Sequence, residues 1–261
     1  AERGLFDAIF FADGQSAGDP SSGPLWFLEP LTALAAIARK TSRIGLVATV
    51  STTFHTPFHA ARMLASLDHI SQGRIGWNVV TSMFDVEARN HSMSAMPTSN
   101  ERYARAAEFV DAALALWDSW AEDAIIADRA DIFADPDKVT PIDHTGQHFQ
   151  VAGPLNVPRG PQGRPVLFQA GASEAGRELA ARYAEAVYVV AYDLASGREY
   201  TSDVRRRIAL QGRDETKVAF MPGLVTYVGS TEAEAQAKKA ELDTLLPTKQ
   251  SLAQLSTFVG Q

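Results

Sequence analysis

A short loop of small residues, Gln169–Ser173, is the part of this sequence whose residue types point most directly to chemistry. The apolar run Val166–Phe168 before it is typical of a buried parallel strand, and a helix is expected to begin near Glu174. The first N–H groups of a helix lack intrahelical partners and carry partial positive charge, so small residues there let a phosphate approach the backbone. Serine is also a common helix cap, and the loop taken alone favours that ordinary role for Ser173.

Polar side chains are also expected where the other apolar runs end. These positions are Asp13, Thr49, Ser51–Thr53, Asn78, Thr81–Ser82 and Tyr188–Tyr192. Most are neutral hydrogen-bonding or aromatic groups, without the facing carboxyl pair that glycoside hydrolysis needs and without a lysine inside a strand. Such a set suits a cofactor that brings its own reactivity. FMN fits, because it combines a planar ring, a polar ribityl chain and a phosphate.

Two histidines four residues apart, His55 and His59, could face a metal ion from a helix start. No third ligand is spaced nearby, so we predict no metal site. No residue stands out as a general acid or base. Asn78 carries a stronger functional indication, because an inward-facing asparagine in a parallel strand is costly unless it is paired.

The elements that must position these residues alternate along the chain. Strands are expected at Asp7–Ala12, Ile44–Val50, Ile75–Val80, Val166–Gly171, Ala186–Val190 and Val218–Val228. Helices are expected at Glu29–Lys40, Pro57–Ile70, Glu101–Trp120, Ser173–Ala184, Ser196–Gln211 and Thr231–Leu246. Alternation of this kind indicates βαβ units and a parallel sheet.

Two architectures compete for this pattern: an open doubly wound sheet and a closed (β/α)8 barrel. The first predicted loop has no G-x-G-x-x-G, so the dinucleotide-binding form lacks its main support. We therefore predict a single α/β domain over residues 1–261, a (β/α)8 TIM barrel without its first and last strands. Residues 125–161 break the alternation and are expected to pack beside the barrel as an insertion, and residues 14–24 are expected to form a mobile loop.

Composition excludes several classes of function. The formal charge of −7 argues against a nucleic-acid-binding surface, which needs a basic stripe. The absence of cysteine excludes disulfides, thiolate metal sites and a cysteine nucleophile. No apolar run approaches the roughly 20 residues of a membrane span. A cytoplasmic location is the default expectation.

Five segments form an ordered set of motifs. They are FDAIFFADG (6–14), LASLDHISQGRIGWNVVTS (64–82), EARN (87–90), ERYARAAEFVDAALALWDSW (101–120) and HTGQHFQVAGPLNVPRGPQGRPVLFQAGASEAG (144–176). In this order and spacing the chain resembles flavin-dependent monooxygenases of the bacterial-luciferase-like superfamily. The resemblance is to the branch of nitrilotriacetate, EDTA, dibenzothiophene-sulfone and long-chain-alkane monooxygenases, and it thins to general pattern beyond about residue 190.

The resemblance implies a two-component enzyme that uses reduced FMN and O2 to oxygenate a small organic substrate through a flavin hydroperoxide. A separate NAD(P)H-dependent flavin reductase would supply the FMNH2, and the protein would be a homo-oligomer, a dimer or tetramer. The positions implied for cofactor binding are Asp13, Thr49, Asn78, Tyr103 and Ser173. Those implied for the substrate pocket are Phe10 and Tyr188; together with Phe11 and Phe84 they favour an apolar substrate.

The sequence departs from the family pattern at one flavin contact. Members commonly have a histidine four residues before the tyrosine of the R-Y motif, and this chain has Ser99 there. In family members, histidines that help to activate oxygen or bind substrate often lie on the first and last strands of the barrel, which this chain is expected to lack. Because these histidines and the one at position 99 are not found, two other functions stay open: a deazaflavin-dependent barrel enzyme that transfers hydride, and a non-catalytic flavin-binding paralogue.

Overall fold

The computed structural model describes residues 1–17, 28–129, 131–245 and 251–252. These residues belong to two compact units. The first unit holds the described residues of 1–16 and 26–222, and the second holds residue 17 and those of 223–261. Residues 18–24 of the predicted mobile loop, and residue 246 at the end of the last predicted helix, lie outside the described residues. The single domain predicted for residues 1–261 stays a prediction.

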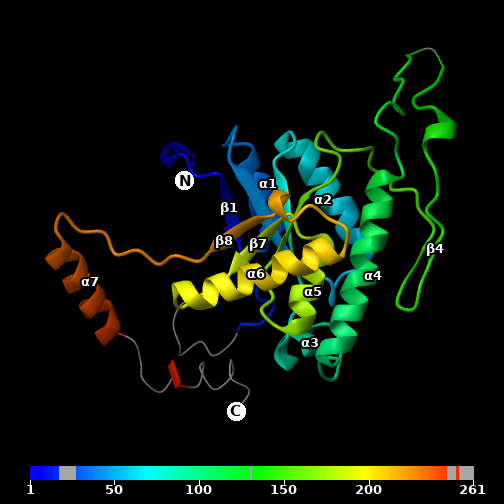
Figure 1. Ribbon diagram of the computed structural model, residues 1–261. Coiled ribbons are helices and arrows are strands. Elements are labelled where there is room, and N and C mark those ends of the chain that lie inside the picture. The colour runs from blue at the N-terminus through cyan, green and yellow to red at the C-terminus, as the bar shows by residue number, and fades with distance from the viewer. Residues whose placement is uncertain (18–27, 130, 246–250, 253–261) are drawn as a thin grey trace. The chain divides into compact units, whose positions relative to one another are not determined.

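A six-stranded sheet forms the centre of the first unit (Figure 1). All of its neighbouring strands pair in parallel, in the order β1-β2-β3-β6-β7-β8. The strands are β1 (Ala8–Phe11), β2 (Gly45–Ser51), β3 (Ile75–Val80), β6 (Val166–Gln169), β7 (Ala186–Val189) and β8 (Ala219–Pro222). Each corresponds to a predicted strand, although β8 stops well before Val228. Its pairing with β7 ends at Pro222, which has no N–H to donate.

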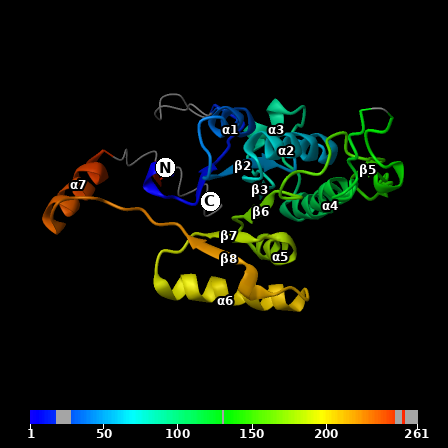
Figure 2. The same ribbon diagram turned by 90° about the horizontal axis from the view of Figure 1, so that it is seen from above.

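Helices of the first unit follow the strands. They are α1 (Pro30–Ala38), α2 (Pro57–Ser71), α3 (Asp85–Asn90), α4 (Ser99–Asp118), α5 (Glu174–Tyr183) and α6 (Leu194–Leu210). Short 3-10 turns occur at Glu2–Gly4, Pro136–Lys138 and Glu215–Lys217. Figure 2 shows the strands in an arc with α1, α2, α4, α5 and α6 along its outer side. The helical prediction missed only α3 among these, because six residues are too few for a clear period.

The sheet is curled rather than flat. Phe10 on β1 and Phe168 on β6 meet edge-to-face with ring centroids 5.9 Å apart, although two strands separate β1 from β6. Across a flat sheet, three strand spacings would separate them by about 14 Å. The contact therefore requires a concave inner face. This confirms the predicted fold class, with six strands of a (β/α)8 barrel among the described residues.

The main core lies between the outer face of the sheet and the helices. Trp77 on β3 has no exposed surface and lies 5.8 Å from the Phe109 ring and 6.1 Å from the Trp117 ring. Its indole N–H donates to the Val50 carbonyl at 3.0 Å, so the polar edge of this buried ring is satisfied. A second apolar cluster joins β7 to α5 and α6.

Several residues of the family-like motifs stabilise this scaffold. Arg74 donates to the carbonyls of Ala38, Thr41 and Ile44, which ties the end of α1 to the start of β2. Asp68 on α2 accepts from the side-chain amide of Gln162 at 2.7 Å, although 94 residues separate them. Burial raises the pKa of Asp68, partly offset by these hydrogen bonds. The LDHISQGR and GPQGR segments therefore meet and place β6 beside β3.

The predicted insertion contains a short hairpin, β4 (His144–Thr145) with β5 (Gln150–Val151). Glu108 on α4 anchors it, since its carboxylate accepts from the backbone N–H groups of His148 and Phe149 and contacts His144 Nε2 at 3.2 Å. The insertion thus packs against α4, as expected for residues 125–161.

The second unit contains helix α7 (Glu232–Thr244), capped by the Thr231 hydroxyl, which accepts from Glu234 N at 3.2 Å. Its ion pairs, Lys238–Glu234 and Lys239–Asp243, are spaced i,i+4 along the helix. In the part of the chain that the structure describes, no helix combines the length and apolar character needed to cross a membrane.

Candidate functional site

Thr49 and Asn78 are paired on the inner face of the sheet. They are register partners on β2 and β3, both 5% exposed, and Asn78 Nδ2 donates to Thr49 Oγ1 at 2.9 Å. The other amide atom, Asn78 Oδ1, is buried and accepts no hydrogen bond from the described residues. Burying an amide oxygen without a donor costs about 1–3 kcal/mol. This oxygen therefore offers an acceptor to a ligand that carries an N–H or O–H group.

Thr49 also borders a cavity of about 270 Å³ at the carboxyl end of β1 and β2, together with Asp13 and His55. Asp13 is half-buried and accepts from the side-chain amide of Gln15 at 3.1 Å. Glu29 closes another side while its carboxylate caps α1 by accepting from Leu31 N. The structure thus brings two of the predicted cofactor positions, Asp13 and Thr49, to one cavity.

His55 also borders this cavity, although the only function considered for it from the sequence was metal binding. Its Nδ1 lies 3.0 Å from the Ser51 carbonyl, and burial lowers the pKa of its imidazole. Among the described residues, no group of three or more histidine, aspartate or glutamate side chains is placed to hold a metal ion.

The loop after β6 and the start of α5 form a second part of the site. Ser173 is the N-cap of α5, and its hydroxyl accepts from Gly176 N at 3.2 Å. Tyr103 comes from α4 to the same place, since a Cβ added at Gly171 or Gly176 would lie 3.0 Å from its hydroxyl oxygen. At either position the added Cβ would also lie 2.9 Å from the Cα of the other glycine, so only glycine fits. The structure therefore brings the predicted residues Tyr103 and Ser173 together.

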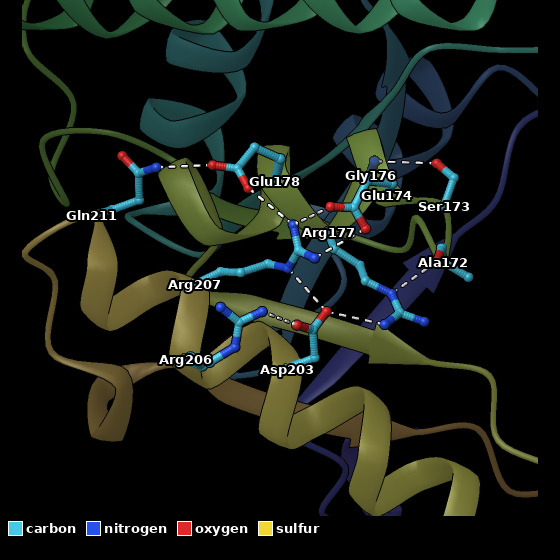
Figure 3. A network of polar contacts seen from close by, with 10 residues as sticks. All are labelled: Ala172, Ser173, Glu174, Gly176, Arg177, Glu178, Asp203, Arg206, Arg207 and Gln211. Atoms are coloured by element: carbon cyan, nitrogen blue, oxygen red, sulfur yellow. Dashed lines mark hydrogen bonds and ion pairs between the residues drawn. The ribbon is translucent and has the colours of Figure 1, made fainter.

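Helices α5 and α6 hold this loop by binding two of the loop's carbonyl groups. The Tyr200 hydroxyl donates to the Gly171 carbonyl at 2.9 Å. Arg177 Nε donates to the Ala172 carbonyl at 3.0 Å, and its NH1 forms a 3.0 Å ion pair with Asp203 on α6 (Figure 3). Both carbonyl oxygens are thereby held by donors from α5 and α6.

Charges within this network balance one another. Asp203 also binds Arg206 and Arg207. Burial alone would raise the pKa of the Asp203 carboxyl, but hydrogen bonds from the three arginines outweigh it and lower the pKa to about 2. Arg207 in turn binds Glu174 at 2.7 Å, which offsets the negative charge in the first turn of α5 (Figure 3). Hydrogen bonds to Glu174 and Asp203 raise the pKa of the Arg207 guanidinium.

Aromatic side chains lie on the inner face of the sheet, next to the Thr49–Asn78 pair. Phe168 is the register partner of Asn78, and its ring contacts Phe10, which is 40% exposed. Tyr188 on β7 is 41% exposed. Phe11 was expected with them on the substrate side, but it packs against the core cluster because adjacent strand residues point to opposite faces. Phe84 precedes α3 and is partly exposed.

Ser99 is the first residue of α4, one turn before Tyr103. The cap of this helix is Thr98, which forms a capping box with Glu101. Ser99 is exposed and makes no hydrogen bond with another described side chain. The helix start is therefore stable without the histidine that the family pattern places here.

The described geometry and motifs agree with comparisons across the whole chain. The family profile of luciferase-like monooxygenases matches residues 1–258. The chain belongs to the luciferase-like monooxygenase family. It is 46% identical to N-acetyl-S-(2-succino)cysteine monooxygenase of Bacillus subtilis and 44% identical to nitrilotriacetate monooxygenase component A of Aminobacter aminovorans, in both cases over 100% of this chain. It spans only 59% and 61% of the lengths of those relatives.

Solved structures of luciferase-like monooxygenases have the same fold. The crystal structure of a long-chain alkane monooxygenase superposes with a TM-score of 0.93 at 33% identity, covering 100% of this chain and 63% of that one. EDTA monooxygenase from Chelativorans sp. BNC1 gives a TM-score of 0.84 at 38% identity, covering 93% of this chain and 59% of that one. The family resemblance inferred from the motifs is therefore confirmed.

The sequence did not indicate four residues of this candidate site: Arg177, Tyr200 and Asp203 around the loop after β6, and His55 in any role other than metal binding. A helical spacing of three places Tyr200 and Asp203 on one face of α6, which is the only local signal for them. Only the fold shows that this face of α6 contacts the loop after β6, where Gly171 lies 29 residues before Tyr200.

Proposed function

We propose that this luciferase-like monooxygenase uses reduced FMN and O2 to oxygenate a small organic substrate. The observation that carries the proposal is the unpaired, buried Asn78 Oδ1 beside Thr49 and the cavity of Asp13. A flavin ring has an edge of N–H donors and carbonyl acceptors, which this neutral pair and the Asp13 carboxylate can match. When bound, reduced FMN would supply the electrons that reduce O2.

The residues present fit FMN at its other end as well. At the start of α5, Gly176 N donates to the Ser173 hydroxyl, and the N–H groups of Glu174 and Ala175 before it lack intrahelical acceptors and can bind a phosphate. Tyr103 and Ser173 lie at this helix start, and Arg207 binds the Glu174 carboxylate that would otherwise repel an anion there. Asp13, Thr49 and Asn78 would hold the ring, and Tyr103 and Ser173 the ribityl and phosphate end. Phe10 and Tyr188 would line the substrate side.

The names of related proteins support the same cofactor and reaction. Several relatives are named monooxygenases, and one of them is named component A of its enzyme. A riboflavin lyase whose structure contains a modified FMN is 34% identical, with a TM-score of 0.84. We therefore extend the proposal to a two-component system in which an NAD(P)H-dependent flavin reductase supplies FMNH2. A homo-oligomeric state and a cytoplasmic location stay predictions.

The deazaflavin alternative has weaker support. An F420-dependent secondary alcohol dehydrogenase shares the fold with a TM-score of 0.66, but at 16% identity this likeness concerns the fold alone. Oxygen dependence separates the two reactions, since hydride transfer needs no O2. The non-catalytic alternative predicts tight binding of oxidised flavin without turnover.

The test is to mix the protein anaerobically with FMNH2 and then with O2. We expect saturable FMNH2 binding, followed by oxidation of the bound flavin with absorbance changes distinct from those of free FMNH2. Failure of a folded sample to bind FMNH2 would refute the proposal. F420 in place of FMN, with and without O2, serves as the matched comparison.

A further inference from the structure

We propose that His55 is the proton-transferring residue of this site and acts through Nε2 in the cavity shared with Asp13 and Thr49. The inference rests on the proposed function, and it assigns an acid–base group that the motifs did not reveal. It depends on the orientation of the imidazole, the rigidity of its loop and the groups around it.

The orientation of the imidazole follows from one hydrogen bond. Nδ1 of His55 lies 3.0 Å from the Ser51 carbonyl oxygen, which can only accept. Nδ1 must therefore carry the proton, and in the neutral ring Nε2 keeps its lone pair. His55 borders the cavity of about 270 Å³, which has room for a reacting group.

The loop that carries His55 is held rigidly. The Thr52 and Thr53 hydroxyls donate to the carbonyls of Val80 and Thr81 at 3.1 and 2.6 Å, which binds the end of β2 to the end of β3. Arg105 donates to the His55 carbonyl at 3.4 Å. A proton-transferring group works best when its position is fixed before reaction, and this one is fixed by bonds to two strands and a helix.

The surroundings of His55 favour its neutral form. The ionisable groups near it are Asp13 after β1, Glu29 at the start of α1, His59 on α2, His91 after α3 and Arg105 on α4. Burial lowers the pKa of His55, and His59 and His91 lower it further, while Asp13 raises it and the hydrogen bond to Ser51 opposes the shift. The imidazole is thus a base at neutral pH that can take up and release a proton.

The proposed reaction includes a proton transfer that His55 can perform. Substrate, O2 and the two electrons and two protons of FMNH2 give the oxygenated substrate, oxidised FMN and water. His55 would accept one of these protons at Nε2 and return it to the oxygen atom that leaves as water. The imidazole ends in the neutral form in which it began.

The first test measures the tautomer and the pKa of His55 in the protein without any cofactor. Long-range ¹H–¹⁵N NMR of the ligand-free protein should show His55 protonated on Nδ1 only, with a pKa lowered from the ordinary value of histidine. Adding FMN should shift the His55 ¹⁵Nε2 signal and leave that of His59 in place. A proton on Nε2 in the neutral ring, or an unchanged Nε2 signal at FMN saturation, would overturn the proposal.

The second test removes Nε2 but keeps the anchor. In His55→Asn the side-chain amide can still donate to the Ser51 carbonyl, so the loop should hold its fold. We expect the O2-dependent oxidation of bound FMNH2 to slow by at least about a hundredfold, and to lose the fall in rate that wild type shows below the His55 pKa. In His55→Ala, added imidazole should restore part of the rate.

His59→Asn is the matched control, because this exposed histidine lies four residues along on α2. It should leave the rate at neutral pH unchanged and keep the fall in rate at low pH, moved slightly to higher pH because one group that lowers the His55 pKa is gone. If His55→Asn binds FMNH2 as wild type does and keeps the wild-type rate and profile, the proton-transfer role is wrong and the proposed function stands. If wild type itself fails to bind FMNH2, the proposed function fails, and the ligand-free NMR still reports on the tautomer.

Discussion

The two ends of the candidate site are stabilised by different forces. At the ends of β2 and β3, neutral groups bond to one another inside the sheet: Asn78 to Thr49, and the Thr53 hydroxyl to the Thr81 carbonyl. At the start of α5, the loop is held by a tyrosine hydroxyl and a network of charges that includes Arg177 and Asp203. One end is fixed by strand geometry, the other by side chains reaching across from α6.

This difference suits the two parts of an FMN molecule. A ring needs hydrogen bonds of defined direction in an apolar setting, and buried neutral pairs supply them without strong dependence on salt or pH. A phosphate needs positive potential, which the helix start provides. Charges near a surface are screened by salt and titrate with pH. We therefore expect mutations at the strand end to affect all flavins and those at the α5 end to affect phosphate-bearing flavins most.

The largest effect is expected from replacing the buried neutral pair. In the double variant Thr49→Val and Asn78→Leu, both polar partners become apolar groups of similar shape, which is nearly neutral or stabilising for the fold. Flavin binding should weaken by about a hundredfold, because two hydrogen-bonding groups of about 1–1.5 kcal/mol each are lost. Titration of FMN and riboflavin, with thermal unfolding of the free protein, measures both effects.

The expected pattern for this pair is equal weakening of both ligands. Leu46→Ala, at a buried position on the opposite face of β2 and away from the cavity, is the control: it should lower stability and leave affinity unchanged. If the double variant binds both flavins normally, the orphaned Asn78 Oδ1 has no part in ring binding.

A smaller effect is expected from Asp203→Asn, which weakens the charged network. The pKa of Asp203 is lowered to about 2 in the folded protein, so its ionised form stabilises the fold above the unfolded pKa near 4, and this contribution is lost as pH falls through about 2. The shift corresponds to about 2 kcal/mol. The variant should unfold more easily near neutral pH and show a flatter pH dependence of stability between about pH 4 and 2.

Arg206→Gln is the control for Asp203→Asn, because it removes an exposed ion pair of the same network. Arg206 is 62% exposed and pairs with the same carboxylate without contacting the loop. Exposed ion pairs contribute about 0–1 kcal/mol, so this variant should remain close to wild type. FMN affinity should fall a few-fold in Asp203→Asn, with riboflavin little changed. Equal stability losses in the two variants would contradict the assignment of Asp203 to the loop.

Most of the fold could be predicted from the sequence, for a physical reason. Strands buried on both faces read as continuous apolar runs, and helices between them carry a regular period. The six strands were therefore predicted with small boundary errors, apart from the end of β8. The β4–β5 hairpin was missed because strands of two residues have no period, and its anchor, Glu108, lies 36 residues before its partner His144.

From local pattern, the candidate site could be predicted only where its residues lie at or near the end of a strand; Tyr103 on α4 was predicted from the family resemblance alone. Asp13, Thr49, Asn78 and the Gln169–Ser173 loop were found from strand ends, because parallel strands bring their carboxyl ends to one edge. The orphaned oxygen of Asn78, the tautomer of His55 and the contact from Tyr200 to the loop depend on distances between segments. No local pattern encodes these, so they had to come from the structure.

A smaller loss of stability than that of Asp203→Asn is expected at Ser173, where the roles of cap and ligand coincide. Ser173→Ala removes the acceptor for Gly176 N, which should lower stability by about 1 kcal/mol, and FMN affinity should fall by about tenfold with riboflavin unchanged. Ser173→Asp keeps a side chain able to cap but adds a negative charge, so it should preserve stability while weakening FMN further. Isothermal titration with both flavins and thermal unfolding measure the two roles separately. If FMN and riboflavin weaken equally in both variants, Ser173 is a cap alone, and the phosphate must bind elsewhere.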